Sequence, residues 1–407
     1  MKKITIIGTG YVGLVTGAGL ADFGNSVICV DIIESKIKLL KNGIIPIYEP
    51  GLKDIIKHNV KEKRLNFTTN IKKAINNSEV IFIAVGTPEL ETGDADLSFI
   101  EQVAKVIGEN LNNYKVICTK STVPIGTGDT ICKTIKLNNN NDTSFDYVSN
   151  PEFLREGSAV KDFLWPDRVI IGASSERAFT VMKDVYRPLY VNEKPILHTN
   201  IETAEMIKYA ANSFLALKIS YINEIANLCE EVGADVHLVA KGMGKDGRIS
   251  SKFLHPGPGF GGSCFPKDTR ALVSLASNKN IELKTVKATI EVNIQQKERM
   301  FLKLKKLLNN NISNKLIAVL GIAFKPNTDD FRESSSINMI ESILKEGGIV
   351  NTYDPVISDE IKKTFPIINC FNSWENCSKD TDALVIMTEW NVLRGLDLKK
   401  LAVLMKT

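Results

Sequence analysis

The sequence has few of the residues that form disulfide frameworks or metal sites. It contains seven cysteines, an odd number, and none of them forms a Cys-x-x-Cys pair. Its four histidines are scattered and show no metal-ligand spacing. These absences argue against a disulfide-stapled secreted protein and against a zinc site. We therefore expect no metal, a reducing compartment and a cytoplasmic location.

Long apolar runs and an excess of charge of one sign are also missing. No stretch approaches the roughly 20 apolar residues that cross a bilayer. Met1-Lys2-Lys3 and the apolar run after it resemble a secretory signal, but glycines at 8, 10 and 13 interrupt that run. The 51 basic and 47 acidic residues nearly balance, which argues against nucleic acid or a membrane surface as partner. We expect a small-molecule partner instead.

The pattern along the 407 residues predicts an α/β protein of two or three domains. Residues 1–200 alternate buried-type strands with helices and predict a Rossmann domain. A helix without proline or internal glycine is predicted over 202–232, within a helical domain at 201–308. The polar stretch 309–314 then precedes a second strand-helix-strand pattern, which predicts a Rossmann-like domain at 309–407.

The N-terminal segment carries a dinucleotide-binding pattern. An apolar run at 4–7 ends at Gly8-Thr9-Gly10-Tyr11-Val12-Gly13, a helical stretch follows, and a second apolar run ends at Asp31. In this pattern Gly8 allows the tight turn, Gly10 the close approach of a pyrophosphate, and Gly13 the packing of the helix on the strand. Asp31 would bind ribose hydroxyls and repel a 2′-phosphate, which predicts NAD. A tight turn alone would explain the glycines but not Asp31.

Polar turns follow three of the later predicted strands, at 86–88, 121–124 and 150–157. Ligands of an open parallel sheet bind at the carboxyl ends of its strands, so we expect these turns to line one cleft. Ordinary turn chemistry explains Thr87 equally well. It explains Glu152 and Glu156 less well, because two carboxylates four residues apart near a nucleotide need a reason.

The long predicted helix carries Lys208 and Asn212, which are four residues apart and so share one face. Asparagine is a poor helix former, and nothing in the helix itself requires it. A catalytic pair and a solvated polar stripe both fit this spacing, and the spacing does not separate them.

A glycine-rich stretch at 257–268 contains a single cysteine, Cys264. Pro266 predicts a helix that begins at or just after Cys264. The unpaired N–H groups of the helix start and the charge of Lys267 would both stabilise a thiolate. Asp268 would reach the same site as a base or an orienting group. A buried structural cysteine is the alternative, but the combination of glycines, lysine and aspartate favours a nucleophile.

Together these motifs resemble the UDP-glucose/GDP-mannose dehydrogenase family over nearly the whole chain. The motifs that carry the resemblance are Gly-Thr-Gly-Tyr-Val-Gly, Val-Gly-Thr-Pro, Ser-Thr-Val-Pro, Asn-Pro-Glu-Phe-Leu-Arg-Glu-Gly, Glu-Met-Ile-Lys-Tyr-Ala-Ala-Asn, Phe-Gly-Gly-Ser-Cys-Phe-Pro-Lys-Asp and Phe-Lys-Pro-Asn-Thr-Asp-Asp-Phe-Arg-Glu-Ser. The cysteine and lysine motifs look like the UDP-glucose branch. The resemblance implies a four-electron oxidation of UDP-glucose to UDP-glucuronate with NAD, through a thiohemiacetal and a thioester on Cys264.

The resemblance also implies roles for residues across the chain. The catalytic residues would be Cys264, Lys208, Asp268, Asn212, Glu152 and Thr122. The NAD-binding residues would be Gly8, Gly10, Tyr11, Val12, Gly13, Asp31, Lys36, Thr87, Thr122, Glu156 and Arg332. The substrate-binding residues would be Glu152, Phe153, Leu154, Lys208, Asn212, Arg248, Phe253, His255, Gly257, Gly259, Phe260, Gly261 and Lys325. Arg248 would act on the neighbouring subunit of a homodimer or higher oligomer built on the 202–232 helix.

One departure and three alternatives stand beside this interpretation. Family members continue into a further strand and an Asp-x-Arg-Asn motif, which the sequence to Thr407 lacks. The substrate could be a UDP-N-acetylhexosamine or GDP-mannose. A one-step β-hydroxyacid dehydrogenase would need neither the cysteine nor a second nucleotide domain. A non-catalytic nucleotide-sugar-binding protein would tolerate the loss of Cys264 and Lys208, which are both present.

Overall fold

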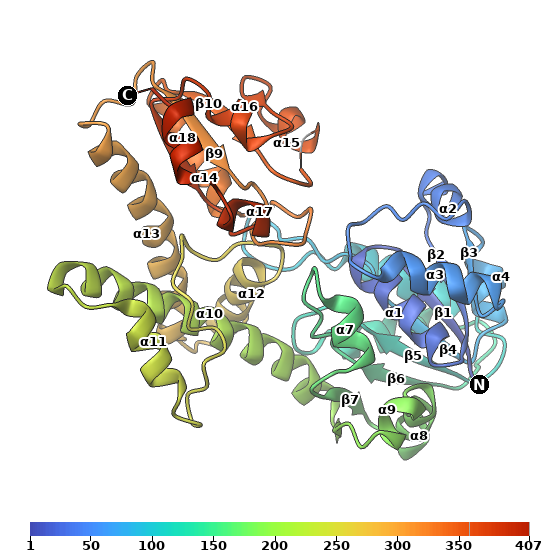
Figure 1. Cartoon of the computed structure of the whole chain (residues 1–407). Coiled ribbons are helices and arrows are strands. Elements are labelled where there is room, and N and C mark those ends of the chain that lie inside the picture. Colours follow the sequence, from blue (N-terminus) through green and yellow to red (C-terminus); the bar gives the residue numbers. More distant parts are fainter. Residues whose placement is uncertain (358, 407) are drawn as a thin grey trace. The chain divides into compact units, whose positions relative to one another are not determined.

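The computed structural model describes residues 1–357 and 359–406. Its chain divides into two compact units, Met1–Ala210 and Ala211–Thr407. Figure 1 shows the whole chain with many of its helices and strands labelled. The α/β class with two nucleotide-binding-type sheets is confirmed. The three-domain division with boundaries after residues 200 and 308 stays a prediction.

The first unit is built on an eight-stranded sheet in the order β3-β2-β1-β4-β5-β6-β7-β8. Its strands are β1 (Lys3–Ile7), β2 (Ser26–Val30), β3 (Leu65–Thr68), β4 (Val80–Ile83), β5 (Lys115–Thr119), β6 (Phe145–Ser149), β7 (Val169–Ala173) and β8 (Ile196–Thr199). Neighbours are parallel except β6 and β7, which are antiparallel. The strand order reverses at β1, because β2 pairs with one of its edges and β4 with the other. This reversal is the switch point at which doubly wound sheets bind nucleotides.

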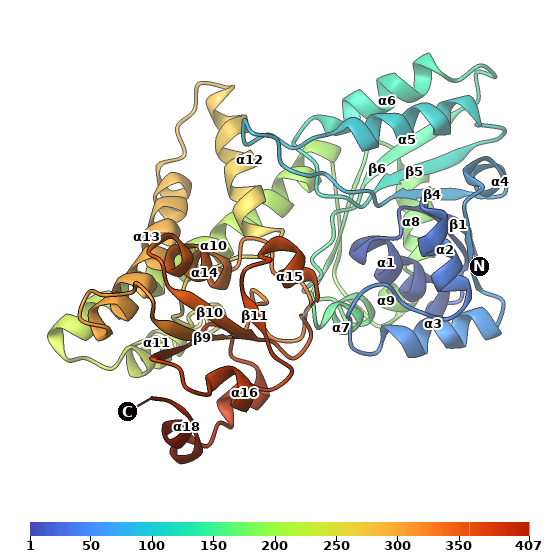
Figure 2. The ribbon, with the colours of Figure 1, turned by 90° about the horizontal axis from the view of Figure 1, so that it is seen from above.

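Helices cover both faces of this sheet. They are α1 (Tyr11–Asp22), α2 (Glu34–Lys41), α3 (Leu52–Lys61), α4 (Ile71–Asn76), α5 (Ser98–Glu109), α6 (Thr127–Leu137), α7 (Ala159–Leu164), α8 (Glu176–Val185) and α9 (Arg187–Val191). Figure 2 shows α5 and α6 on one face and α1 and α3 on the other. With both faces covered, successive side chains of one strand enter different cores, which explains the unbroken apolar runs.

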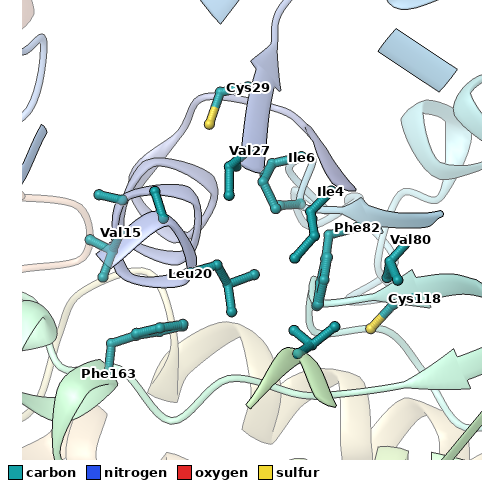
Figure 3. Close-up of a cluster of buried hydrophobic side chains, with 14 of the residues drawn as sticks. Ile4, Ile6, Val15, Leu20, Val27, Cys29, Val80, Phe82, Cys118 and Phe163 are labelled. Atoms are coloured by element: carbon teal, nitrogen blue, oxygen red, sulfur yellow. The ribbon is translucent and has the colours of Figure 1, made fainter. Parts of the chain in front are cut away.

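Strand β4 illustrates this division of its side chains. Val80 and Phe82 lie in the core beneath α1, whereas Ile81 and Ile83 lie in the core beneath α5 and α6. Figure 3 shows the first of these cores, where the Phe163 ring from α7 closes the cluster.

Helix α10 (Ile201–Val232) runs through the division between the units. It matches the predicted 202–232 helix and ends at Val232, just before Gly233, whose φ of +71° is the left-handed conformation that terminates many helices. None of the helices in the described part of the chain is long and apolar enough to cross a membrane.

The second unit contains a parallel four-stranded sheet in the order β11-β10-β9-β12. Its strands are β9 (Leu316–Leu320), β10 (Ile349–Tyr353), β11 (Asn369–Cys370) and β12 (Ala383–Ile386). Its helices after α10 are α11 (Val236–Gly244), α12 (Phe265–Ser277), α13 (Lys284–Leu307), α14 (Ser335–Lys345), α15 (Asp359–Thr364), α16 (Trp374–Ser378), α17 (Asn391–Arg394) and α18 (Leu398–Leu404). Within the helical domain predicted at 201–308, the part after Cys264 forms two helices, α12 and α13, separated at 278–283.

Candidate active site

The three glycines of the N-terminal turn meet different surroundings. A Cβ added at Gly8, whose φ is +104°, would lie 2.4 Å from the Ala84 carbonyl oxygen. One added at Gly13 would lie 2.0 Å from the Gly8 carbonyl oxygen. One added at Gly10 would meet nothing within 4 Å. The fold itself therefore requires Gly8 and Gly13, whereas Gly10 leaves open space at the start of α1, where N–H groups favour a phosphate.

Asp31 follows β2 and faces the same turn. Its carboxylate accepts hydrogen bonds from the Thr9 backbone N–H (2.9 Å), the Thr9 hydroxyl (2.6 Å) and the Ile33 N–H (3.0 Å). Lys36 Nζ lies 3.7 Å away. Burial opposes ionisation, but these hydrogen bonds and the Lys36 charge outweigh it and lower the pKa of Asp31. An ionised carboxylate beside the turn fits the ribose of NAD.

Tyr11 connects this turn to the loop that carries Glu152. The Tyr11 hydroxyl donates a hydrogen bond to Glu49, and the Gly157 N–H donates to Glu49 Oε2 at 2.7 Å. Burial, together with the Glu49 carboxylate, raises the pKa of Tyr11 well above its usual range. Sequence reasoning missed Glu49, because a single glutamate in a loop carries no signal of a partner 108 residues later.

Glu152 and Lys208 form a buried ion pair. Lys208 Nζ lies 2.9 Å from Glu152 Oε1, and the two side chains are only 4% and 6% exposed. Lys208 Nζ also lies 5.3 Å from the centroid of the Phe153 ring, and the Arg168 guanidinium stacks on that ring at 3.7 Å. The structure thus joins two predicted catalytic residues and a predicted substrate contact. Arg168 was not predicted.

Lys120 is a second buried cation of this region that sequence reasoning missed. Its Nζ lies 3.2 Å from Asn150 Oδ1 and 3.4 Å from the Tyr186 hydroxyl. Burial lowers the pKa of Lys120 to about 8, which nearby Glu152 partly counters. In the sequence this lysine looks like one more polar residue of the turn after β5.

The turns after β4 and β5 lie side by side, as the sequence predicts. The Thr87 hydroxyl donates a hydrogen bond to the Thr122 carbonyl at 2.9 Å.

Glu205 of α10 accepts hydrogen bonds from the N–H groups of Gly126 (2.7 Å) and Gly128 (3.1 Å) at the start of α6. Burial raises the pKa of Glu205 to about 7 despite these bonds.

Cys264 occupies the predicted position in the second unit, immediately before α12, and is partly buried. Asp268, one turn later, is 1% exposed. Its carboxylate accepts hydrogen bonds from Lys267 Nζ (2.6 Å) and from the Asn212 amide (2.7 Å). The structure therefore brings Asn212 and Asp268 together, and it pairs Lys267 with a carboxylate near the cysteine.

Among the other predicted substrate residues, Leu154 lies on the loop after β6 in the first unit, whereas Arg248 and Lys325 lie on loops of the second. Arg332, a predicted NAD contact, also lies on a loop of the second unit. Arg248 is 90% exposed and pairs with Asp246 at 2.6 Å. Arg332 binds Asp330 at 2.8 Å, and Lys325 Nζ lies 5.3 Å from the centroid of the Phe324 ring. In residues 1–357 and 359–406, no three His, Cys, Asp or Glu side chains are grouped so as to hold a metal ion.

The chain matches sequence models of three domains of the UDP-glucose/GDP-mannose dehydrogenase family. The NAD binding domain matches residues 2–190, the central domain residues 202–295 and the UDP binding domain residues 318–407. The matches follow one another in this order and leave only short segments between them.

Individual relatives cover the whole chain. A UDP-glucose 6-dehydrogenase of Rhizobium meliloti is 50% identical over 100% of this chain and 93% of its own length. The Bacillus subtilis UDP-glucose 6-dehydrogenase TuaD is 48% identical over 100% of this chain and 87% of its own length. A solved UDP-glucose dehydrogenase from Pyrobaculum islandicum superposes with a TM-score of 0.94 at 35% identity, covering 98% of this chain and 92% of its own. A solved UDP-D-ManNAc dehydrogenase from Pyrococcus horikoshii superposes with a TM-score of 0.87 at 27% sequence identity. The match covers 99% of this chain and 93% of the Pyrococcus chain.

Proposed function

Because the chain belongs to the UDP-glucose/GDP-mannose dehydrogenase family, we propose that it oxidises UDP-glucose to UDP-glucuronate in two NAD-dependent steps. One observation carries the proposal: Cys264 lies at the N-terminus of α12, directly after a glycine-rich loop. A one-step hydroxyacid dehydrogenase needs no such nucleophile. The 50% and 48% identity to UDP-glucose 6-dehydrogenases, against 27% to the UDP-D-ManNAc enzyme, favours glucose as the sugar.

NAD, when bound, supplies the hydride acceptor; its pyrophosphate would lie at Gly10 and its ribose at Asp31. The protein's own residues would control the substrate oxygen. Lys208 and Asn212 share a face of α10, where they would donate hydrogen bonds to the C6 oxygen as it becomes anionic. A protonated lysine and an amide favour the anionic form of that oxygen over the neutral one.

The second oxidation would depend on Cys264. Its thiolate adds to the aldehyde carbon, so that an S–C bond forms, the carbonyl π bond breaks and the oxygen takes a proton. Loss of the hydroxyl proton together with the C6 hydride then leaves a thioester. Water activated near Glu152, Asp268 and Thr122 would cleave the S–C bond and return the thiolate. Covalent capture keeps the reactive aldehyde from escaping between the two oxidations.

The substrate would be held by residues that contact its phosphates and sugar. They are Phe153, Leu154, Phe253, His255, Gly257, Gly259, Phe260, Gly261 and Lys325. Thr87, Thr122, Glu156 and Lys36 would complete the NAD site, and Arg332 would lie between cofactor and substrate.

We further propose a cytoplasmic homodimer built on α10, with Arg248 acting on the neighbouring subunit. The helix exposes Phe214 (62%), Tyr221 (45%) and Leu228 (58%) at seven-residue spacing, the periodicity of a helix-pairing stripe. Analytical ultracentrifugation of the wild type and of Tyr221→Lys tests this. A wild type that sediments as a monomer contradicts it.

Substrate choice is tested by the NADH released per sugar from UDP-glucose, UDP-N-acetylmannosamine and GDP-mannose. We expect two NADH per UDP-glucose and much slower turnover of the other two. Preferential turnover of UDP-N-acetylmannosamine or GDP-mannose would replace the substrate while leaving the family unchanged. Binding of UDP-glucose without any NADH would favour a non-catalytic protein.

The mechanism is tested by Cys264→Ala, which removes the sulfur and leaves the loop in place. We expect this variant to bind NAD and UDP-glucose and to form essentially no UDP-glucuronate, with residual turnover limited to about one NADH per sugar. Supplying the 6-aldehyde should not restore acid formation. A Cys264→Ala protein that still yields two NADH per sugar would overturn the mechanism.

A further inference from the structure

Three buried carboxamides hold the backbone of the loop that leads to Cys264. Asn223 Oδ1 accepts a hydrogen bond from the Gly257 N–H at 2.8 Å, and Gln296 Nε2 donates to the Gly257 carbonyl at 2.9 Å. The third, Asn293, binds further along the loop. We refer to Asn223, Asn293 and Gln296 as the carboxamide clamp. All three side chains belong to residues less than 7% exposed.

Asn293 binds both peptide groups of one residue. Its Oδ1 accepts the Phe260 N–H at 2.7 Å, and its Nδ2 donates to the Phe260 carbonyl at 3.0 Å. A carboxamide carries one acceptor and a donor side by side, so it can replace the strand partner that this irregular buried backbone lacks. A Cβ added at Gly259 would lie 3.0 Å from Asn293 Oδ1, which shows how closely the loop and the amide fit.

The held residue lies next to the nucleophile in space. The Phe260 ring packs edge-on against the Phe265 ring, with centroids 6.0 Å apart and planes at 86°. Phe265 is the first residue of α12 and directly follows Cys264. A shift of Phe260 would therefore be transmitted through Phe265 to the start of α12 and to the sulfur.

Two further contacts support this path. Gln296, on the same face of α13 as Asn293, accepts a hydrogen bond from the Asn227 amide of α10 at 2.9 Å. This bond fixes which way the Gln296 carboxamide points. Lys297 Nζ donates to the Glu333 carbonyl at 2.8 Å, and a Cβ at Gly261 would lie 2.4 Å from that same oxygen. The loop is thus enclosed on both sides, and Asn293 binds its middle.

We propose that Asn293 is a positioning residue that holds Cys264 in place for capture of the aldehyde, acting through the Phe260 peptide. This inference rests on the proposed function, because it assigns Asn293 to the second oxidation. Misplacing a reacting group by about 1 Å can cost about 100-fold in rate. Because Phe260 is also a proposed substrate contact, the comparison is made at saturating UDP-glucose. There, loss of the amide should slow the capture step and leave the first hydride transfer, which does not use the sulfur, within about threefold of wild type.

The experiment compares Asn293→Leu and Asn293→Asp with Gln295→Leu, an exposed neighbour on the other side of α13. NADH per UDP-glucose is measured with semicarbazide present to trap free aldehyde. We expect two NADH per sugar for the wild type and for Gln295→Leu. For both Asn293 variants we expect the ratio to fall towards one while the semicarbazone accumulates. The aspartate keeps the acceptor for the Phe260 N–H but places a second oxygen against the Phe260 carbonyl, so it should behave like the leucine.

Two outcomes overturn the inference: an Asn293 variant that keeps two NADH per sugar, or one in which both hydride transfers slow equally. Amide hydrogen exchange of the wild type tests the clamp even if a variant does not fold. The Phe260 N–H should exchange far more slowly than an exposed peptide, and fast exchange contradicts the clamp. A wild type that never releases two NADH from UDP-glucose refutes the proposed function, which the variants alone cannot do.

Discussion

The buried pair of Lys208 and Glu152 yields the most demanding quantitative prediction. With 2.9 Å between Nζ and Oε1, Coulomb's law at an effective dielectric constant of about 20 gives an attraction of about 6 kcal/mol. Removing both ions from water costs several kcal/mol each, so the pair's net contribution to stability is small. One charge left alone in the same place retains its cost without the attraction. Truncating either partner should therefore destabilise far more than replacing both.

Lys120 makes the two single substitutions unequal. Its pKa is raised by Glu152 and lowered by Lys208, so its charge acts on both partners. After Lys208→Met, Lys120 still provides a cation near Glu152. After Glu152→Gln, both buried lysines lose the attraction of this carboxylate. We expect Lys208→Met to cost about 3 kcal/mol and Glu152→Gln about 5 kcal/mol, within the range found when buried pairs are broken.

The assay is a double-mutant cycle on the free energy of unfolding, measured by urea denaturation at pH 7. The double variant Lys208→Met/Glu152→Gln should cost only about 1–2 kcal/mol, less than either single variant, so the coupling energy should be about 6–7 kcal/mol, close to the calculated attraction. The exposed pair Lys287–Glu282, at 3.4 Å with side chains 48% and 56% exposed, is the control and should couple weakly. Additive single effects, or a larger cost for Lys208→Met than for Glu152→Gln, would refute the reasoning.

Three further predictions concern the first unit. Because Asp31 is ionised, kcat/KM should be at least about tenfold higher with NAD than with NADP, since a lost hydrogen bond to a charged group costs about 1.5–3 kcal/mol. Equal kcat/KM values for the two cofactors would show that Asp31 does not bind the ribose. Gly10→Ala should keep the wild-type Tm and weaken NAD binding in calorimetry, whereas Gly8→Ala should lower the Tm. The reason is that a Cβ at Gly8 meets the protein's own backbone and a Cβ at Gly10 does not. Equal losses of Tm in the two variants would contradict this. The Glu205 carboxyl ionises near pH 4.5 when unfolded but keeps its proton to about pH 7 when folded. The unfolded state therefore binds fewer protons in that window, and the wild type should lose about 3 kcal/mol relative to Glu205→Gln between pH 4.5 and 8 (about 2.5 pKa units at 1.36 kcal/mol each). A difference in unfolding free energy that is independent of pH would contradict the burial of this charge.

The sequence predicted the elements whose pattern is local. Strand β4 is an unbroken apolar run because helices cover both of its faces. Its composition alone therefore predicts a buried strand. Strand β3 (Leu65–Thr68) alternates leucine, asparagine, phenylalanine and threonine at the edge of the sheet, and this weaker pattern was missed. The antiparallel direction of β7 could not be predicted, because the side-chain period of a strand is the same in both directions.

The candidate site divides in the same way. The glycines of the N-terminal turn, Asp31 and Cys264 belong to short sequence motifs, and the spacing of residues in these motifs predicts their chemical roles. Glu49 and Asn293 belong to none, since each binds backbone groups far along the chain, at Gly157 and Phe260. A side chain whose partner is a distant peptide group leaves no periodic signal, so only the structure finds it.

The two sheets end their second strands with an aspartate, but they use it differently. Asp354, after β10, accepts hydrogen bonds from five of the chain's own N–H groups, those of Ile322, Ala323, Val356, Ile357 and the Trp390 indole. A carboxylate has about four acceptor positions, so this one has no capacity for a ribose. Among the residues that the structure describes, Asp31 accepts hydrogen bonds only from Thr9 and Ile33. Of these two aspartates, Asp31 is therefore the one that can bind a ribose, and in the proposed mechanism the two oxidations of one sugar would use this NAD site in turn. In that mechanism the half-oxidised sugar would have to stay bound while the cofactor is exchanged, and the proposed covalent bond to Cys264 would provide that retention.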